Sequence, residues 1–214
     1  MRVEVARVSV KVLGGGDFPV RRIWCVGQNY RAHALEMGGD PDRAPPFFFQ
    51  KPADAIVVDG GSVPYPPMTA ALEHEIELVV AMGAADRIFG YAVGVDLTRR
   101  DLQAAARKAG RPWDMAKGFD HSAPCGAITP ADVAGAMSAG AIWLQVNGVT
   151  RQSSDISQRI WNTADMIAEL SRYVALFPGD LIFTGTPENV GKLERGDRLL
   201  GHIDGLSDLR VSIS

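Results

Sequence analysis

Apolar residues occur along this chain in short runs that alternate with polar residues and end at glycine or proline. In residues 1–20 the apolar positions recur about every second residue, as far as a triple-glycine turn at Gly14–Gly16. A period of two is typical of a strand with one buried face. Similar runs predict strands at residues 22–26, 47–51, 74–80, 90–96 and 141–149, one strand within 178–187 and two within 192–214.

Three segments have the composition and spacing of helices instead. They are residues 28–38, 97–110 and 163–176, and the first two end in glycine, a common helix terminator. Residues 40–46 and 111–126 are expected to be irregular. The chain has no internal repeat, low-complexity tract or domain boundary that we can identify. Many short strands with about three helices predict one β-rich α+β domain spanning residues 1–214.

The strand that begins at His74 carries two acids at alternate positions. Glu75 and Glu77 share one face of such a strand, and Ile76 and Leu78 share the other. Two neighbouring carboxylates repel each other, but they suit a hard cation such as Mg²⁺, Mn²⁺ or Ca²⁺ placed between them. By spacing alone they are also compatible with an ordinary solvent-exposed strand face.

The other candidate catalytic and binding residues can each also be explained by an ordinary structural role. His33 and Glu36 are neighbours on one helical face, either as a water-activating pair or as a surface pair. Asp96, at a strand-to-helix junction, is a candidate ligand or an N-cap. Lys117 is either a buried cation for an anionic substrate or a surface lysine. The aromatic run 47–49 is expected to belong to the core.

Composition narrows the function classes. The chain has 214 residues, a net charge of -3 and 22% charged residues, which is ordinary for a globular protein and gives no basic footprint for nucleic acid. No apolar run is long enough to span a membrane, and the first residues do not resemble a signal peptide. With Cys25 and Cys125 as the only cysteines, we expect no disulfide framework and a reduced, cytoplasmic location.

Taken together, several motifs closely resemble the fumarylacetoacetate hydrolase superfamily, in its order and over nearly the whole chain. They are Val26-Gly27-Gln28-Asn29-Tyr30 with His33 and Glu36, His74-Glu75-Ile76-Glu77-Leu78, Gly94-Val95-Asp96-Leu97-Thr98-Arg99-Arg100-Asp101, Lys117, and Thr184-Gly185-Thr186-Pro187. Segments 44–51 and 117–126 are similar to those of small acylpyruvate hydrolases, in particular bacterial fumarylpyruvate hydrolases. The resemblance implies a mixed β-sandwich or roll and a homodimer.

The resemblance also implies a role for each matching residue. Glu75, Glu77 and Asp96 correspond to three metal-binding carboxylates, for Mg²⁺ or Mn²⁺ with Ca²⁺ possible. His33 and Glu36 correspond to the water-activating dyad, on a segment that orders over bound substrate in relatives. The expected substrate contacts are Lys117, Arg100, Gln103 and Thr186. No acid occurs between Ile23 and Ala32, so water and substrate are expected to complete the metal's coordination.

The reaction implied is hydrolysis of the C–C bond of an acylpyruvate, with fumarylpyruvate as the best single substrate, in the breakdown of gentisate and other aromatic compounds. A pyruvoyl group can chelate the metal, which polarises its carbonyl while the dyad activates water. The alternatives are oxaloacetate decarboxylation, isomerisation or hydration of hydroxylated dienoic acids, and a catalytically silent metal-binding protein. The intact dyad favours hydrolysis.

The chain departs from the resemblance in one place. Only residues 82–89 connect the strand of Glu75 and Glu77 to the next strand, where family members carry a longer insertion with a helical stretch. None of the candidate site residues lies in this connection. The short connection bears only on the contacts between subunits that the resemblance implies near this edge.

Overall fold

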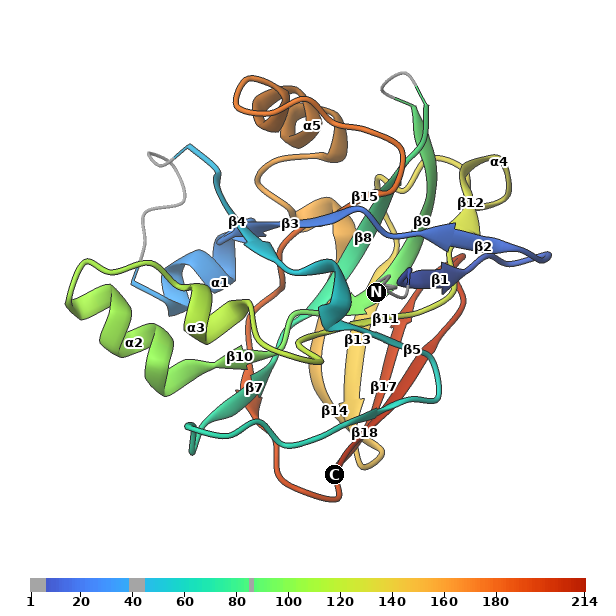
Figure 1. Ribbon diagram of the computed structural model, residues 1–214. Helices are drawn as coiled ribbons and strands as arrows, with labels where there is room; N and C mark the ends of the chain where they lie inside the picture. The colour runs from blue at the N-terminus through green and yellow to red at the C-terminus, as the bar shows by residue number, and fades with distance from the viewer. Residues whose placement is uncertain (1–6, 39–44, 85–86) are drawn as a thin grey trace, which may run out of the picture.

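Two β-sheets packed face to face form the centre of the protein. We describe it from a computed structural model, in which residues 7–38, 45–84 and 87–214 are described. The larger sheet has the order β4-β3-β15-β8-β9-β11-β5, with β12 paired to β9 (Figure 1). Its strands are β3 (Arg22–Gly27), β4 (Phe47–Lys51), β5 (Ile56–Val58), β8 (Ile76–Met82), β9 (Ile88–Val95), β11 (Ala123–Cys125), β12 (Thr129–Pro130) and β15 (Asp180–Phe183).

The second sheet has five strands in the order β14-β13-β17-β18-β6, and two small sheets flank the pair. The five strands are β6 (Ser62–Val63), β13 (Ala141–Val146), β14 (Val149–Asp155), β17 (Arg198–Ile203) and β18 (Leu209–Ile213). The small sheets contain β7 (Leu72–His74), β10 (Thr98–Arg99) and β16 (Gly191–Lys192), and β1 (Ser9–Lys11) and β2 (Asp17–Pro19).

The core divides at the larger sheet because successive residues of a strand face opposite sides. Leu78, Val80 and Met82 of β8 pack in the cluster between the two large sheets. Val79 and Ala81 point the other way, into a second cluster that includes residues of β1 and β2. All seven residues of β8 are buried, so the strand is covered on both faces. Glu77 lies on the same face as Val79, inside the protein.

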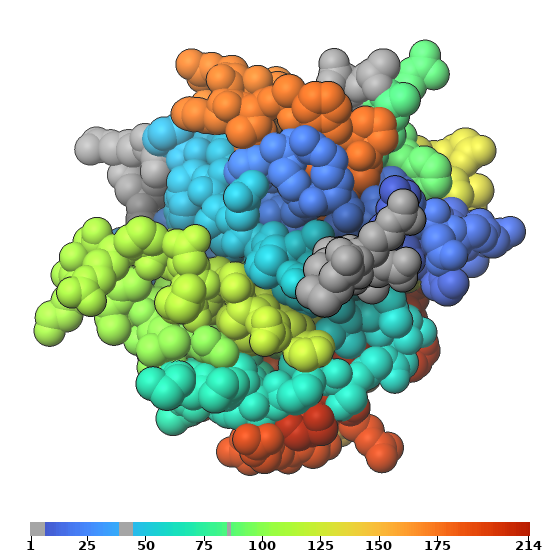
Figure 2. Space-filling view, in the orientation of Figure 1, coloured from blue at the N-terminus to red at the C-terminus, as the bar shows by residue number. Residues whose placement is uncertain are grey.

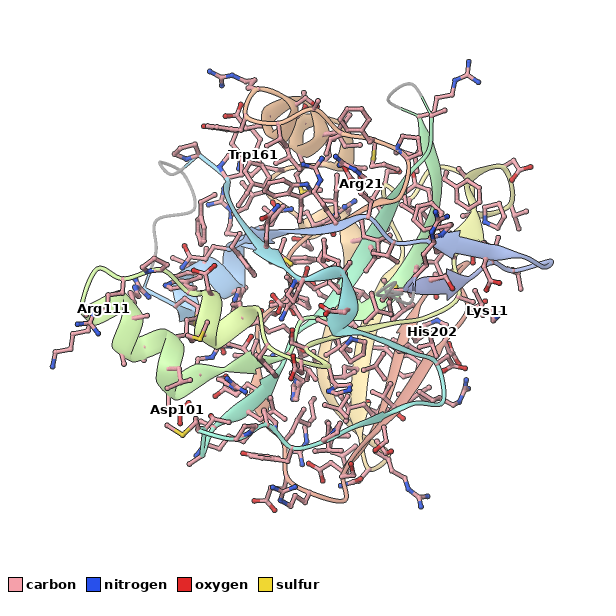
Figure 3. All side chains as sticks on the ribbon, in the orientation of Figure 1. Lys11, Arg21, Asp101, Arg111, Trp161 and His202 are labelled. Atoms are coloured by element: carbon pink, nitrogen blue, oxygen red, sulfur yellow. The ribbon has the colours of Figure 1, made fainter. Side chains whose placement is uncertain are left out.

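The helices of the described chain lie outside the sheets. They are α1 (Arg31–Glu36), α2 (Arg100–Lys108), α3 (Asp114–Lys117), α4 (Ala131–Ala134) and α5 (Thr163–Ser171). Figure 1 shows α1, α2 and α3 gathered at one side, near β4 and β7, with α5 apart from them at the top. Asp101 and Arg111 mark the beginning of α2 and the chain just beyond its end (Figure 3).

The predicted α+β, β-rich fold class is confirmed. The three expected helices correspond to α1, α2 and α5, each shorter than its predicted segment, and α3 and α4 add one turn each. Residues 111–126, expected to be irregular, contain α3 and β11. The predicted β-structure of residues 1–20 is present in β1 and β2, while residues 1–6 lie outside the described part.

The short connection at residues 82–89 is a hairpin between β8 and β9. The two strands pair antiparallel from Ile76 opposite Val95 to Met82 opposite Ile88. The backbone N–H of Gly83 donates to the carbonyl of Arg87 at 2.7 Å, which closes the hairpin end. Residues 85–86, in the middle of the connection, lie outside the described part.

Candidate metal and catalytic site

Three carboxylates converge where β7, β8 and β9 meet α2. Glu75 lies in the break between β7 and β8, Glu77 is the second residue of β8, and Asp96 directly follows β9. One oxygen of each lies within 4.8 Å of the others. Glu77 pairs with Gly94 across the strands, and the N–H of Asp96 donates to the carbonyl of Glu75 at 2.8 Å. Backbone pairing therefore brings the three acids together.

These acids are buried, so the alternative of a solvent-exposed acidic strand face is wrong. Glu75 is 5% exposed, Glu77 1% and Asp96 0%. Asp96 is not an N-cap either, because β10 intervenes and Arg99 occupies the N-cap position of α2. Buried carboxylates need compensating charge, and it comes from three basic residues around them.

Lys117 is the central cation of the cluster. Its Nζ donates to Glu75 Oε2 at 2.7 Å, to Asp96 Oδ2 at 2.8 Å and to the hydroxyl of Thr98 at 2.6 Å. It is 2% exposed, which excludes the surface-lysine alternative. Its ammonium also lies 5.2 Å from the ring centroid of Phe49, a favourable cation–π distance.

A second buried lysine supports the same carboxylates and was not predicted. Lys51 Nζ lies 2.8 Å from Asp96 Oδ1 and donates to the carbonyls of Leu97 and Lys117. By bonding the backbone at Lys117, it links β4 to the C-terminus of α3. The sequence offered no signal for Lys51, which is a single lysine after an aromatic run.

Arg100, the first residue of α2 and an expected substrate contact, lies against Glu75. Its Nη2 donates to Glu75 Oε1 at 2.5 Å, its Nη1 to Gln103 Oε1 at 2.5 Å and its Nε to Glu73 Oε2 at 2.6 Å. Both Arg100 and Gln103 face the site. Glu73, a partner that sequence reasoning missed, holds the guanidinium from the neighbouring strand.

The pKa values of Glu75 and Glu77 are shifted in opposite directions. Burial opposes ionisation of Glu75, but the ammonium of Lys117 and the guanidinium of Arg100 outweigh it and lower the pKa of Glu75. Burial, reinforced by Asp96 and Glu75, raises the pKa of Glu77 well above its usual value. Burial also disfavours charged Lys117, yet Asp96 and Glu75 raise its pKa overall. Glu77 is therefore the acid least compensated by protein cations.

The predicted dyad forms on α1. His33 Nδ1 lies 3.0 Å from Glu36 Oε2, and Glu36 Oε1 accepts from the backbone N–H of Asn189 at 3.3 Å. His33 is 5% exposed, so the alternative of a fully exposed surface pair does not hold for the histidine. A carboxylate bonded at Nδ1 leaves Nε2 as the basic nitrogen.

A cavity of about 450 Å³ joins the dyad to the carboxylates. The residues predicted for the site that line this cavity are His33, Glu75, Glu77, Arg100, Gln103, Lys117 and Thr186. Glu36 and Asp96 are not part of the lining. Figure 2 shows the surface around α2 and α3, in green, next to the residues of β4, in light blue.

The expectation that residues 47–49 belong to the core is wrong for Phe47, while Phe48 and Phe49 each pack against a core cluster. Phe47 and Phe49 line the cavity together with Trp113, and Phe47 is 37% exposed. β4 is the edge strand of its sheet, and among its residues only Lys51 is buried. Trp113 packs edge-on against both rings, at centroid distances of 5.3 and 6.0 Å. The aromatic run forms a wall of the site.

The donor set fits a divalent cation. Carboxylate oxygens are the ligands that Mg²⁺ and Mn²⁺ prefer, and three of them lie together here. Among the described residues, Asp96 Oδ1 has an ion-pair neighbour in Lys51 but no hydrogen bond of good geometry. Glu77 receives one hydrogen bond, from the N–H of Gly185 at 2.8 Å. Both acids therefore retain capacity to bind a cation.

Comparison with known proteins agrees with this arrangement. The family model for the fumarylacetoacetate (FAA) hydrolase C-terminal domain matches residues 22–214. The chain belongs to the fumarylacetoacetate hydrolase family. A fumarylpyruvate hydrolase from Ralstonia sp is 43% identical over 177 residues, covering 78% of this chain and 92% of that one. The expected enzyme class, a hydrolase acting on C–C bonds, agrees with the name of this relative.

Two further relatives bear on the chemistry. The crystal structure of a Pseudomonas aeruginosa fumarylpyruvate hydrolase in complex with Mn²⁺ and pyruvate has a TM-score of 0.96 and 50% identity, covering 100% of this chain and 98% of that one. The oxaloacetate tautomerase YcgM of Escherichia coli K12 is 38% identical over 202 residues, covering 89% of this chain and 92% of that one.

Proposed function

We propose that this protein hydrolyses acylpyruvates to pyruvate and a carboxylic acid, with fumarylpyruvate as the preferred substrate. The observation that carries the proposal is a single cavity with a buried acidic triad at one wall and the His33–Glu36 pair at another. A metal site alone would serve several reactions of 2-oxo acids. Hydrolysis additionally needs a base for water, and this pair supplies one.

Each group of the chain has a defined task in this reaction. Glu75, Glu77 and Asp96 would hold Mg²⁺ or Mn²⁺, which when bound supplies Lewis-acid polarisation of the 2-oxo acid. His33 Nε2 takes the proton of the attacking water while Glu36 holds Nδ1. Lys117, kept charged by Asp96 and Glu75, offsets negative charge that develops on the substrate.

The preference for a longer diacid is supported by α2. Its residues Arg100, Gln103, Ala104, Arg107 and Lys108 all line the cavity. These positions form one helical face, and seven residues of helix span about 10 Å. The cavity therefore has cationic side chains at two ends, with Ala104 and the aromatic wall between them. An acylpyruvate with a second carboxylate on its acyl group matches this distribution.

The second candidate is chemistry on oxaloacetate, which the oxaloacetate tautomerase relatives favour. Decarboxylation, which the sequence also allowed, and isomerisation of dienoic acids would use the same triad without the dyad as water-activating base, whereas hydration of dienoic acids would use both. Oxaloacetate has both carboxylates close together, so it would leave the outer end of α2 without a partner. We also propose a role in gentisate degradation and a homodimeric state, on family resemblance alone.

The test is a comparison of three substrates with the Mn²⁺-loaded enzyme: fumarylpyruvate, acetylpyruvate and oxaloacetate. We expect the highest kcat/KM for fumarylpyruvate and a lower value for acetylpyruvate, which lacks the distal carboxylate. Arg107→Gln should reduce this difference by lowering turnover of fumarylpyruvate only. Turnover of oxaloacetate without hydrolysis of either acylpyruvate would replace the proposal with the second candidate.

A further inference from the structure

Gln152 is a fully buried polar side chain behind the cavity, on strand β14. Its Oε1 accepts from the backbone N–H of Ile76 at 3.1 Å and lies 2.9 Å from Nδ1 of His74. Its Nε2 donates to the hydroxyl of Thr186 at 3.0 Å and to the carbonyl of Pro187 at 2.9 Å. One side chain thus joins the residues on either side of Glu75 to the loop that carries Thr186.

The orientation of the Gln152 amide follows from its two backbone partners. A backbone N–H can only donate and a backbone carbonyl can only accept. The atom facing Ile76 is therefore the oxygen, and the atom facing Pro187 is the nitrogen. The reversed amide would place two donors together at Ile76 and two acceptors together at Pro187, inside the protein, where unmatched polar groups are costly.

This orientation determines what the Thr186 hydroxyl does. The hydroxyl has one proton to donate and two lone pairs to accept with. Because Gln152 Nε2 has no lone pair to offer, Thr186 Oγ1 must accept in this bond, and its own proton remains for another partner. Thr186 is 2% exposed and lines the cavity. A hydroxyl in this state is a donor for an anionic oxygen of a bound ligand.

We propose that Gln152 is a positioning residue that sets Thr186 as a hydrogen-bond donor to the carboxylate of a 2-oxo acid. Gln152 does not line the cavity, so it acts through Thr186. The same bonds fix the distance between the Thr186 loop and the backbone on both sides of Glu75. The inference deepens the proposed function, on which it rests for the identity of the ligand.

The experiment measures binding of pyruvate to Mn²⁺-loaded protein by calorimetry, which does not depend on turnover. Thr186→Val should weaken pyruvate binding by about tenfold or more, the effect of losing one hydrogen bond to a charged group. Thr186→Ser, which keeps the hydroxyl, should bind nearly as the wild type does. Gln152→Met should lose about as much pyruvate affinity as Thr186→Val does.

A double variant separates positioning from a general structural role. If Gln152 acts through Thr186, adding Gln152→Met to Thr186→Val costs no further pyruvate affinity. In turnover, Gln152→Met should raise KM more than it lowers kcat. Gln145→Met is the matched control, because Gln145 on the adjacent strand β13 also donates to a threonine hydroxyl, that of Thr150 at 3.4 Å, at an exposed position.

Several results would overturn the inference. One is additive losses in the double variant, and another is unchanged pyruvate binding in Gln152→Met. If Gln152→Met does not fold, Gln152→Glu, which keeps the side-chain length, takes its place in the same binding experiment. Unchanged pyruvate binding in Thr186→Val overturns the donor role of Thr186 by itself. Pyruvate binding as expected without hydrolysis of any acylpyruvate would contradict the proposed function and leave this inference standing.

Discussion

At the scale of single residues, the site separates groups that hold charge from the group that moves a proton. Lys117, Lys51 and Arg100 are bound to the carboxylates by hydrogen bonds or ion pairs of 2.5–2.8 Å. His33 stands apart from them, bonded to Glu36. Removing a group of the first kind should disturb ligand or metal binding, and removing His33 should disturb the chemical step.

His33→Ala is accordingly expected to abolish hydrolysis while leaving metal binding intact. General-base catalysis contributes about 10²–10⁴-fold to rate, so kcat should fall by at least that factor. Steady-state kinetics, with Mn²⁺ titration by calorimetry, checks both parts. His121→Asn is the control, because His121 is exposed and has a positive φ of 62°, which asparagine tolerates. Retained turnover in His33→Ala would contradict the role given to His33.

At the scale of elements, the loop after β15 holds one metal-site acid through its backbone. Gly185 has φ +93°, and its N–H donates to Glu77 Oε2 at 2.8 Å. A Cβ on Gly185 would lie 2.6 Å from Cβ of Asn29. Asn29 itself is fixed, since its Nδ2 donates to the carbonyl of Thr184 at 2.8 Å and its Oδ1 accepts from the N–H of Trp161 at 2.7 Å.

Gly185→Ala should therefore move the loop and weaken Mn²⁺ binding, measured by calorimetry. Gly196→Ala is a close control, because Gly196 has φ +94° and open space where a Cβ would lie, so it shares the backbone strain without the collision. We expect both variants to lose some stability and only Gly185→Ala to lose metal affinity. Equal Mn²⁺ affinities in the two variants would show that the loop does not hold Glu77.

A second tie between elements joins β3 to β15. The buried carboxylate of Asp180 accepts from Arg21, which is labelled in Figure 3, at 3.0 Å and from Arg22 at 2.7 Å. Burial opposes its ionisation, but hydrogen bonds from Arg22, the N–H of Phe177 and Arg21 lower the pKa of Asp180. A carboxyl group whose pKa is lowered by folding stabilises the protein at pH values above its ordinary pKa. This stability is lost as the pH falls through the lower pKa of the folded state.

Asp180→Asn should cost about 1.5–3 kcal/mol of unfolding free energy at neutral pH, the range for hydrogen bonds to charged groups. The difference from wild type should shrink in acid, once Asp180 is protonated in both states. Urea denaturation at several pH values measures it, with the exposed Asp132→Asn as the control. A difference that stayed constant into acid would contradict the charged state of Asp180.

At the scale of the whole molecule, the elements could be predicted from local pattern, but the site depends on contacts between distant segments. Alternation of apolar residues and the Asn147-Gly148 turn predicted the longer strands, but short strands such as β5, β11 and β12 were missed. The metal and dyad residues were identified by resemblance. Lys51 and Gln152 were missed because their bonds cross more than 30 residues of sequence. Phe47 was misassigned because hydrophobicity does not reveal whether an edge strand borders a core or a cavity.

Bound metal should also stabilise the whole protein, because the triad that binds it forms only on folding. At 100 times its dissociation constant, a ligand adds about 2.7 kcal/mol to the folded state. For a chain of this size that corresponds to about 5–10 °C in Tm. Scanning calorimetry with Mn²⁺ and with EDTA measures the shift, which Asp96→Asn should abolish. A shift of equal size in Asp96→Asn would place the stabilising metal elsewhere.

Solution size is a separate whole-molecule prediction. Light scattering should give twice the chain mass of 23.0 kDa if the predicted homodimer forms. Within the described residues, no helix is long and apolar enough to cross a membrane. A mass equal to one chain at micromolar concentration would contradict the dimer and leave the site, whose described residues come from one chain, unaffected.

The central claim is that water attacks the acyl carbonyl of an acylpyruvate in this cavity. Turnover of fumarylpyruvate by the Mn²⁺-loaded enzyme in H₂¹⁸O, followed by mass spectrometry of the products, tests it most directly. We predict fumarate that carries one labelled carboxylate oxygen, formed together with an equal amount of pyruvate. If the substrate is consumed or rearranged without release of fumarate, the enzyme is not an acylpyruvate hydrolase.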